Sequence, residues 1–304
     1  MTTPVHLLPL DPAYPTRLRG LPRPPATITV QGGSLEAPHV VAIVGSRDAH
    51  DDTAAMAREL ARQLVNAGAV VASGGALGID ASAHVGALEA AGRTWVVAPT
   101  GHRRLFPPQH KDLFDAIARG PGAMLWPFSP TYNHRSGFVL RNRVLVALAD
   151  AVVVAQAGRR SGALHAAACA LRQRKPLWVV PAPPWRQEGF EGTHQLIERI
   201  GRDPSQPIRP LTSNKRFLAA IGVAPPAEGA SPTPVALSLS GNEAAVFSAT
   251  STVPLHLDEI AARSQCPSGT VAAVLLTLAL KDVVVEGPPG SFRRRDRPLD
   301  DEDR

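Results

Sequence analysis

Six short apolar runs alternate with helical stretches between residues 40 and 181, and this alternation limits the possible folds more than any other feature. The runs are rich in valine and do not alternate polar with apolar residues, which is typical of strands covered on both faces. Strands separated by helices predict a doubly wound parallel α/β sheet. We predict these strands at residues 40–46, 70–73, 94–99, 123–127, 151–156 and 176–181.

The first of the intervening helices has clear end signals. Asp51 or Asp52 can cap its N-terminus, and Gly68 suits the position just after its C-terminus. Between them Met56, Leu60 and Leu64 recur every four residues and predict one buried face.

The rest of the chain divides by composition. Residues 1–39 predict a short N-terminal extension of a sheet domain at 40–220, and the Pro, Ala and Ser content of 221–238 predicts a linker. Residues 239–293 show three helical stretches, a short strand and a basic turn, which predicts a small C-terminal winged-helix domain. Residues 294–304 are basic and then acidic and predict a charged tail.

Composition excludes several classes of protein. No apolar run reaches the length of a membrane span, and the N-terminus lacks the pattern of a signal peptide. The only two cysteines, Cys169 and Cys266, lie far apart in sequence, which excludes a disulfide framework and a cysteine-rich zinc site. We therefore expect a cytoplasmic protein with no membrane partner.

The charge is concentrated in one segment. Residues 141–175 contain seven Lys or Arg against Asp150 alone, a surplus of six that equals the net charge of the whole chain, +6. Such a local surplus predicts an anionic partner.

Three loops that follow predicted strands combine glycines with a hydroxyl side chain and a helix start. Parallel sheets bind ligands at the carboxyl ends of their strands, and glycines let backbone N–H groups approach an anion. The chain has neither a P-loop nor a G-x-G-x-x-G fingerprint, so we expect no ATP, no NAD and no other cofactor. The candidate phosphate-binding residues of these loops are Gly45, Ser46, Arg47, Ser73, Gly74, Gly75, Gly78, Ser161 and Gly162.

The start of another predicted helix completes the candidate site. Arg141 and Arg143 flank Asn142, and two arginines near the same rim can bridge successive phosphates of a chain. Phe138 lies three residues earlier, where an aromatic ring could stack on a base. Burial of Phe138 in the core is the alternative.

Catalytic alternatives are weaker. Asp80 and His84 are spaced four apart on one helix face and could form an acid–base pair, and Ser73 or Ser161 could act as a nucleophile. His84 more often serves packing, and Asp80 is well placed to accept the N–H groups of the glycine-rich loop. The scattered histidines show no metal-binding spacing. We expect no catalytic residue and no metal site.

Several motifs in one order resemble the DNA-processing protein A (DprA/Smf) family. The resemblance runs from about Tyr14 to Ile200, and the predicted winged helix matches an appendage of many members. The motifs are VAIVGSR, SGGALGIDASAHVGALEAAGRTWVV, Gly101 with Phe106 and Pro107, FVLRNRVLVALADAVVV, AGRRSGALHAAACALRQRKPLWVVP and EGTHQLI.

This resemblance implies an extended Rossmann-like fold, a homodimer and a non-enzymatic mediator of DNA recombination. Members bind incoming single-stranded DNA in natural transformation and load the RecA recombinase onto it. The family's strand-binding pocket would correspond to the loops and the helix start named above, including Phe138. The chain departs from the family pattern where Leu77 replaces an arginine and Gln156 replaces an acidic residue.

Two other functions remain open at this point. A Rossmann hydrolase of the LOG type would act on nucleoside monophosphates, but the matching segment AGRRSGALHAAA lacks the acidic pair of those enzymes. A transcription regulator would read duplex DNA through residues 239–293, and duplex DNA is also a possible further partner of a strand-binding protein. Deleting the winged helix would abolish DNA binding by a regulator and only reduce that of a mediator.

Overall fold

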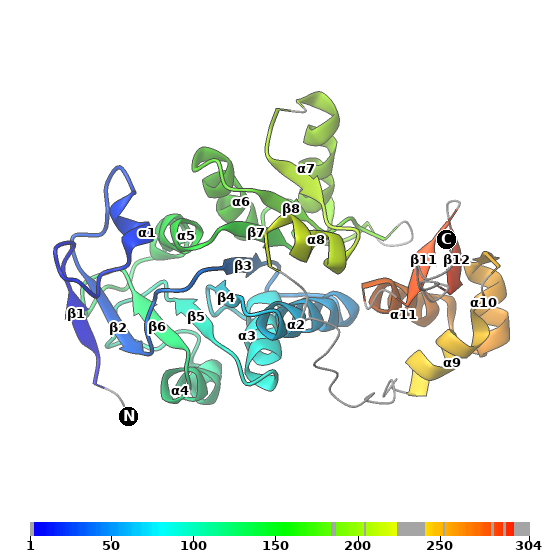
Figure 1. Ribbon diagram of the computed structural model, residues 1–304, viewed down its shortest axis with the longest axis horizontal. Coiled ribbons are helices and arrows are strands. Elements are labelled where there is room, and N and C mark those ends of the chain that lie inside the picture. The colour runs from blue at the N-terminus through cyan, green and yellow to red at the C-terminus, as the bar shows by residue number, and fades with distance from the viewer. Residues whose placement is uncertain are drawn as a thin grey trace, which may run out of the picture.

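The computed structural model describes residues 3–183, 187–203, 205–223, 241–251, 253–280, 283–287 and 290–294. It contains one nine-stranded sheet in the order β1-β2-β6-β5-β4-β3-β7-β8-β9 (Figure 1). The strands are β1 (Val5–Leu7), β2 (Ile28–Gly32), β3 (Val40–Val44), β4 (Val70–Ser73), β5 (Thr94–Val97), β6 (Ala123–Trp126), β7 (Ala151–Val154), β8 (Leu177–Val179) and β9 (Ile208–Pro210).

The strands from β3 to β9 are parallel. The chain builds outward from β3 to β6 and then returns to β7 on the other side of β3, so the strand order reverses between β3 and β7. This is the doubly wound arrangement, and it confirms the six predicted strands and the predicted fold class.

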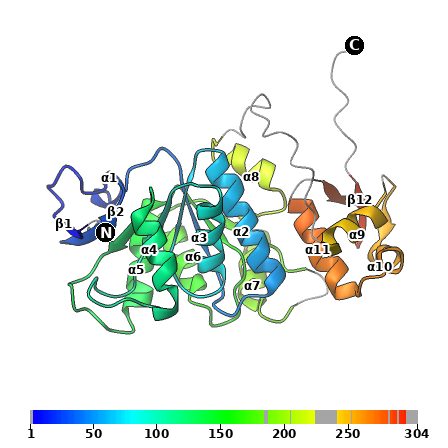
Figure 2. The ribbon, with the colours of Figure 1, turned by 90° about the horizontal axis from the view of Figure 1, so that it is seen from below.

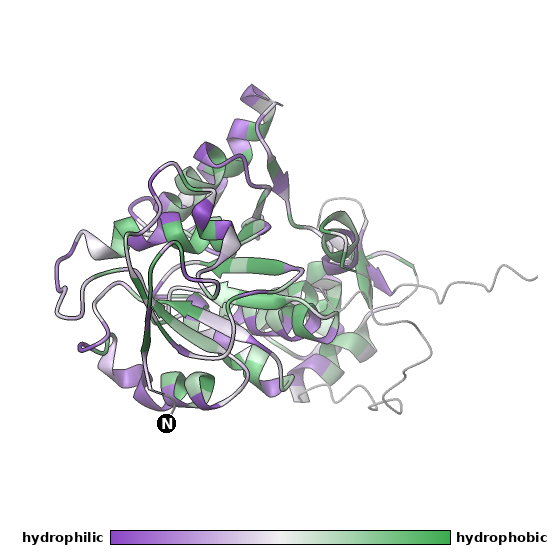
Figure 3. Cartoon of the chain, turned by 60° about the vertical axis from the view of Figure 1, so that its left-hand side comes forward, coloured by the Kyte–Doolittle hydropathy of each residue, from purple (hydrophilic) through white to green (hydrophobic). Residues whose placement is uncertain are grey.

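Helices cover both faces of the sheet (Figures 1 and 2). Alternate residues of β3 enter the two cores, with Val40, Ala42 and Val44 on one side and Val41 and Ile43 on the other. In Figure 3 the central strands are largely hydrophobic. The first side is covered by α1 (Thr16–Arg19), α5 (Gly137–Leu148), α6 (Ala163–Arg172) and α7 (Glu191–Arg202), and the second by α2 (Asp51–Asn66), α3 (Ile79–Glu89), η1 (Pro108–His110), α4 (Lys111–Arg119) and α8 (Asn214–Ala220).

Helix α2 matches its prediction closely. Met56, Leu60 and Leu64 are fully buried, and Gly68 follows the helix with the positive φ of +85° that favours glycine. Its N-cap is His50, so Asp51 and Asp52 lie in the first helical turn instead of capping it.

The N-terminal segment is part of the sheet. Strand β2 pairs antiparallel with β6, and β1 pairs antiparallel with β2. In addition, Arg17 forms an ion pair with Asp150 and donates to the Leu148 carbonyl, while Asp150 accepts the backbone N–H of Val40 at 2.8 Å. These contacts tie α1 to the main domain.

The described residues between 241 and 294 form a smaller unit of three helices and a three-stranded sheet in the order β10-β12-β11. This arrangement agrees with the predicted winged helix. Residues 224–238 of the predicted linker, residues 239–240 of the predicted winged helix and residues 295–304 of the predicted charged tail lie outside the described residues. The elements are α9 (Gly241–Ala249), β10 (Leu255–His256), α10 (Leu257–Ser264), α11 (Ser268–Leu280), β11 (Val284–Glu286) and β12 (Ser291–Arg294).

No helix in the described parts of the chain combines the length and the apolar character needed to cross a membrane.

Candidate nucleic-acid interface

A pocket of about 560 Å³ opens at the carboxyl ends of β3 and β7, where the strand order reverses. Its walls are residues 44–48 after β3, Ala76 and Asp80 after β4, one side of α5, and residues 158–163 with Ala166 after β7. Open α/β sheets bind their ligands at this position. We call it the central pocket.

Many of the residues predicted from sequence line the central pocket. The predicted residues found there are Gly45, Ser46, Arg47, Phe138, Arg141, Asn142, Ser161 and Gly162. Arg159 and Arg160 also line it and are exposed, although they were not among the predicted site residues. Their position between two glycines of a strand-to-helix loop could have identified them as candidate phosphate-binding residues from the sequence.

The loop between β4 and α3 lies directly behind the pocket and allows it to form. A Cβ atom at Gly74 would lie within 1.5 Å of the Arg141 guanidinium, and one at Gly78, where φ is +72°, would lie 2.3 Å from the Ser46 carbonyl oxygen. Glycine is therefore required at position 78 for the close approach of the loops, and at position 74 it leaves the space that the Arg141 guanidinium occupies. The predicted residues in this supporting loop are Ser73, Gly74, Gly75 and Gly78.

Arg143 is placed outside the central pocket. It lies two residues after Arg141 on α5, and positions two apart on a helix point in nearly opposite directions. Its positive charge acts on Tyr14, whose pKa it pulls down against the stronger effect of burial. The structure therefore does not bring Arg141 and Arg143 together in one phosphate clamp.

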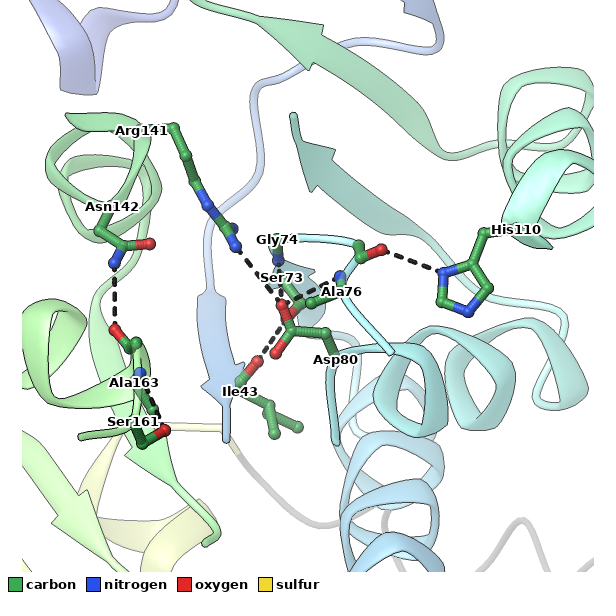
Figure 4. A network of polar contacts seen from close by, with 12 residues as sticks. Ile43, Ser73, Gly74, Ala76, Asp80, His110, Arg141, Asn142, Ser161 and Ala163 are labelled. Carbon is green, nitrogen blue, oxygen red and sulfur yellow. Dashed lines mark hydrogen bonds and ion pairs between the residues drawn. The ribbon is translucent and has the colours of Figure 1, made fainter. Parts of the chain in front are cut away.

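Arg141 is a buried cation at the floor of the pocket. Its Nη2 atom lies 3.6 Å from Oδ2 of Asp80, which also accepts the backbone N–H groups of Gly74 at 3.1 Å and Ala76 at 3.3 Å (Figure 4). Burial lowers the pKa of the guanidinium and Asp80 opposes this, but an arginine remains charged. Nε and Nη1 of Arg141 are buried and have no hydrogen-bond partner among the residues that the structure describes. Buried donors without a partner at a pocket wall mark a place for an acceptor ligand.

Arg47 and Phe138 form the rim of the pocket. The guanidinium of Arg47 lies 4.8 Å from the centre of the Phe138 ring, a cation–π contact. Phe138 is half-buried, since the Phe106 ring packs edge-on against it at 5.0 Å. The rim therefore combines a positive charge with a partly exposed aromatic ring.

Short-range hydrogen bonds hold the pocket loops in place. The Ser46 hydroxyl donates to the Asp48 carbonyl at 2.8 Å, and the Ser161 hydroxyl accepts the N–H of Ala163 at 3.3 Å. The side-chain amide of Asn142 donates to the Gly162 carbonyl at 3.4 Å and links α5 to the loop after β7 (Figure 4). The N-terminus of α6 meets the pocket at this loop, where its N–H groups favour an anion.

Two of the side chains considered for catalysis, His84 and Ser73, are buried and hydrogen-bonded inside the sheet domain. His84 is fully buried, its Nδ1 lies 2.7 Å from the Thr94 hydroxyl, and burial lowers its pKa to about 3. The Ser73 hydroxyl is also buried and donates to the Ile43 carbonyl at 2.6 Å. Both groups therefore serve the packing of the sheet. Among the residues that the structure describes, no group of three or more His, Cys, Asp or Glu could hold a metal ion.

The winged-helix unit is not basic. Residues 241–294 contain four Lys or Arg and five Asp or Glu, and α11, the third helix, contains no charged residue. Leu276 of α11 packs against the core beneath α2. The Arg294 guanidinium donates to the Phe247 and Ser248 carbonyls at the end of α9. The helix that enters the major groove in winged-helix DNA readers is apolar here.

Comparison with protein families agrees with the geometry. The family model described as DNA recombination-mediator protein A matches residues 6–204, more than half of the chain. The chain belongs to the DNA recombination-mediator protein A (DprA) family. A second model, the DprA winged helix domain, matches residues 230–290 and confirms the predicted winged helix.

Relatives within the DprA family match most of the chain. Protein Smf of Synechocystis is 31% identical over 96% of this chain and 80% of its own length, and Protein Smf of Escherichia coli is 30% identical over 95% and 78%. Among solved structures, DprA from Helicobacter pylori has a TM-score of 0.63 at 28% identity and covers 72% of this chain and 96% of its own. DprA from Streptococcus pneumoniae has a TM-score of 0.63 at 29% identity, covering 71% and 73%.

The departures from the DprA pattern have different structural settings. Gln156 is buried, and its side-chain oxygen accepts the backbone N–H of His50 at 3.0 Å while its backbone carbonyl accepts the N–H of Ser46 at 2.8 Å. A neutral amide thus fixes the loop that carries Arg47. Leu77 is 42% exposed at the tip of the β4–α3 loop.

Proposed function

We propose that this chain binds single-stranded DNA in the central pocket as a non-enzymatic mediator of recombination. The observation that carries the proposal is the buried Arg141, whose Nε and Nη1 atoms have no partner at the pocket wall. Phosphate oxygens of a DNA strand are acceptors of the required kind.

The rim supports a single strand as the ligand. Sites for single strands pair a basic groove with aromatic rings on which bases stack. Arg47 and Phe138 supply both elements next to Arg141, and Arg159 and Arg160 add charge on the opposite wall. DprA from Helicobacter pylori, one of the similar solved structures, is described as having a single-stranded DNA binding mode, and a ligand of that class agrees with this assignment.

The remaining parts of the proposal rest on family membership. We propose that the protein acts in the cytoplasm as a homodimer and loads RecA onto incoming strands during natural transformation. Sedimentation of the full chain tests the dimer. Assembly of RecA on single-stranded DNA, measured in the presence and in the absence of this chain, tests the loading.

A transcription regulator that reads duplex DNA is disfavoured. The winged-helix unit has more acidic than basic residues, and α11 offers no cation to a phosphate. A LOG-type hydrolase is disfavoured because the segment from Gly158 to Ala168 contains no carboxylate.

The proposal is tested by titrating the full chain against a labelled single strand and a duplex of the same length and sequence. The expected result is clear preference for the single strand at equal salt. Equal or tighter binding of the duplex would contradict the proposal and support the regulator.

A further inference from the structure

A second cavity adjoins the central pocket. It has a volume of about 780 Å³ and lies between the loop after β5 (residues 98–107) and the loop before α5 (residues 127–136). We call it the loop cavity. Its lining includes Thr100, Arg104, Phe106 and Arg135, and it shares Arg47 and Phe138 with the central pocket.

The two loops that form this cavity are joined to each other. The N–H of Gly101 donates to the Tyr132 carbonyl at 2.9 Å, and the N–H of Arg103 donates to the Pro130 carbonyl at 3.1 Å. A Cβ atom at Gly101 would lie 2.1 Å from the Ser129 carbonyl oxygen, so the close approach requires glycine. The loop cavity is therefore preformed in the folded chain.

The charges in the loop cavity are unpaired. Arg104 and Arg135 are exposed, and among the described residues the side chain of neither has a hydrogen-bond or ion-pair partner. No lining residue is acidic. On α2, by contrast, Arg58 is paired with Glu89 and Arg62 with Glu59. Arginines without an acidic partner around one cavity favour the binding of an anionic ligand there.

An aromatic pair joins the two cavities. The Phe106 ring belongs to the loop cavity and contacts Phe138 at 5.0 Å with an angle of 81° between the ring planes. Phe138 lies at the boundary that the two cavities share, and the Arg47 guanidinium lies over its ring. A ligand that fills both cavities must therefore pass over Phe138.

We propose that the loop cavity binds the nucleotide that follows the one in the central pocket, so that a single strand crosses Phe138 from one cavity into the other. This inference rests on the proposed function and adds a subsite to it. Arg104 contacts a phosphate of the second nucleotide, and Phe106 packs against its base. A free nucleotide fills only one cavity of this size, whereas a strand fills both, which favours a polymer as the ligand.

The test compares four variants of the full chain with the parent protein, the fourth being Arg47→Ala. Arg104→Ala removes one cation of the loop cavity, and Phe106→Leu removes one of its two phenylalanine rings. Arg103→Ala is the matched control, since Arg103 is the neighbouring exposed arginine outside the lining. Fluorescence anisotropy measures affinity for a labelled oligothymidylate across a salt series, and thermal melting checks each fold.

For Arg104→Ala we expect a slope of log affinity against log salt that is shallower by about 0.7, the value of one phosphate contact on a single strand. Phe106→Leu should weaken binding about 5- to 150-fold with the slope unchanged, the range measured for loss of base stacking. Arg103→Ala should behave like the parent protein.

Equal slopes for Arg104→Ala and Arg103→Ala would overturn the subsite whatever the melting behaviour of Phe106→Leu. Arg47→Ala separates this failure from failure of the proposed function, because Arg47 also lines the central pocket. If Arg47→Ala weakens binding while Arg104→Ala does not, the result supports DNA binding in the central pocket and contradicts the second subsite. If neither weakens binding, both proposals are wrong.

Discussion

The guanidinium of Arg141 lies 3.6 Å from the carboxylate of Asp80, and both side chains are almost completely buried. Each partner has a different set of other contacts, since Asp80 also accepts two backbone N–H groups while Arg141 has two donors without partners. The pair thus holds two N–H donors of Arg141 at the floor of the central pocket and fixes the glycine-rich loop behind it.

This asymmetry predicts unequal costs of breaking the pair. Asp80→Ala leaves a buried cation without a counter-charge and should lower the free energy of unfolding by roughly 3–5 kcal/mol. Arg141→Ala should cost less, because Asp80 keeps its two N–H donors. Urea unfolding measures both values, and an Arg141→Ala variant that is the less stable of the two would contradict this description of the site.

Phe138 is expected to stack on a base. Phe138→Leu should reduce single-strand affinity by about 1–3 kcal/mol while the salt slope and melting temperature stay nearly unchanged. Phe217→Leu serves as the control, because Phe217 is fully buried on α8 and should lower the melting temperature without affecting DNA binding. A large drop in melting temperature with unchanged affinity would assign Phe138 to the core.

The buried His84 should lower the free energy of unfolding of the protein at acid pH. Its pKa in the folded chain is about 3, below the ordinary value of 6.5, because burial disfavours the charged ring. Between these two values the unfolded chain binds a proton that the folded chain does not, so stability falls as the pH drops from about 6.5 toward 3, by roughly 4 to 5 kcal/mol at most.

His84→Leu should make stability less dependent on pH within this window. Thr94 retains a partner in the variant, since its hydroxyl also donates to the Val71 carbonyl at 2.9 Å. Urea unfolding of parent and variant across the acid range measures the difference. Parallel pH profiles for the two proteins would show that His84 is protonated in the folded state.

Removal of the winged-helix unit tests the alternative regulator. A chain ending at residue 238 should keep single-strand affinity within about tenfold, or 1.4 kcal/mol, because the described basic residues of the central pocket all remain. Thermal melting of the shortened chain checks its sheet domain, which loses the contact between α11 and α2. Complete loss of DNA binding by a folded, shortened chain would favour the regulator.

The central strands and the pocket loops could be predicted because their signals are local. Valine runs such as residues 151–156 indicate buried strands, and glycines 74 and 78 indicate tight loop approaches. The antiparallel β1 and β2 and the short β9 were not predicted, since three to five residues at a sheet edge carry little pattern of their own.

The sequence predicts many of the residues that line the central pocket, but it does not predict how these residues are arranged in space. Sequence placed Arg141 and Arg143 together, but the turn of α5 separates them. The partners of Arg141 and Gln156, by contrast, come from other strands and loops, and such contacts depend on the tertiary fold. The same holds for the loop cavity, whose residues at 98–107 and 127–136 meet only after the sheet has formed.

The most direct test of the central claim is the salt dependence of single-strand binding by the parent chain and its Arg47→Ala, Arg141→Ala and Arg143→Ala variants. Replacing Arg47 or Arg141 should each make the slope of log affinity against log salt shallower by about 0.7. Replacing Arg143, which lies outside the central pocket, should change it less. Slopes for Arg47→Ala and Arg141→Ala that equal the parent slope would mean that DNA does not bind in the central pocket.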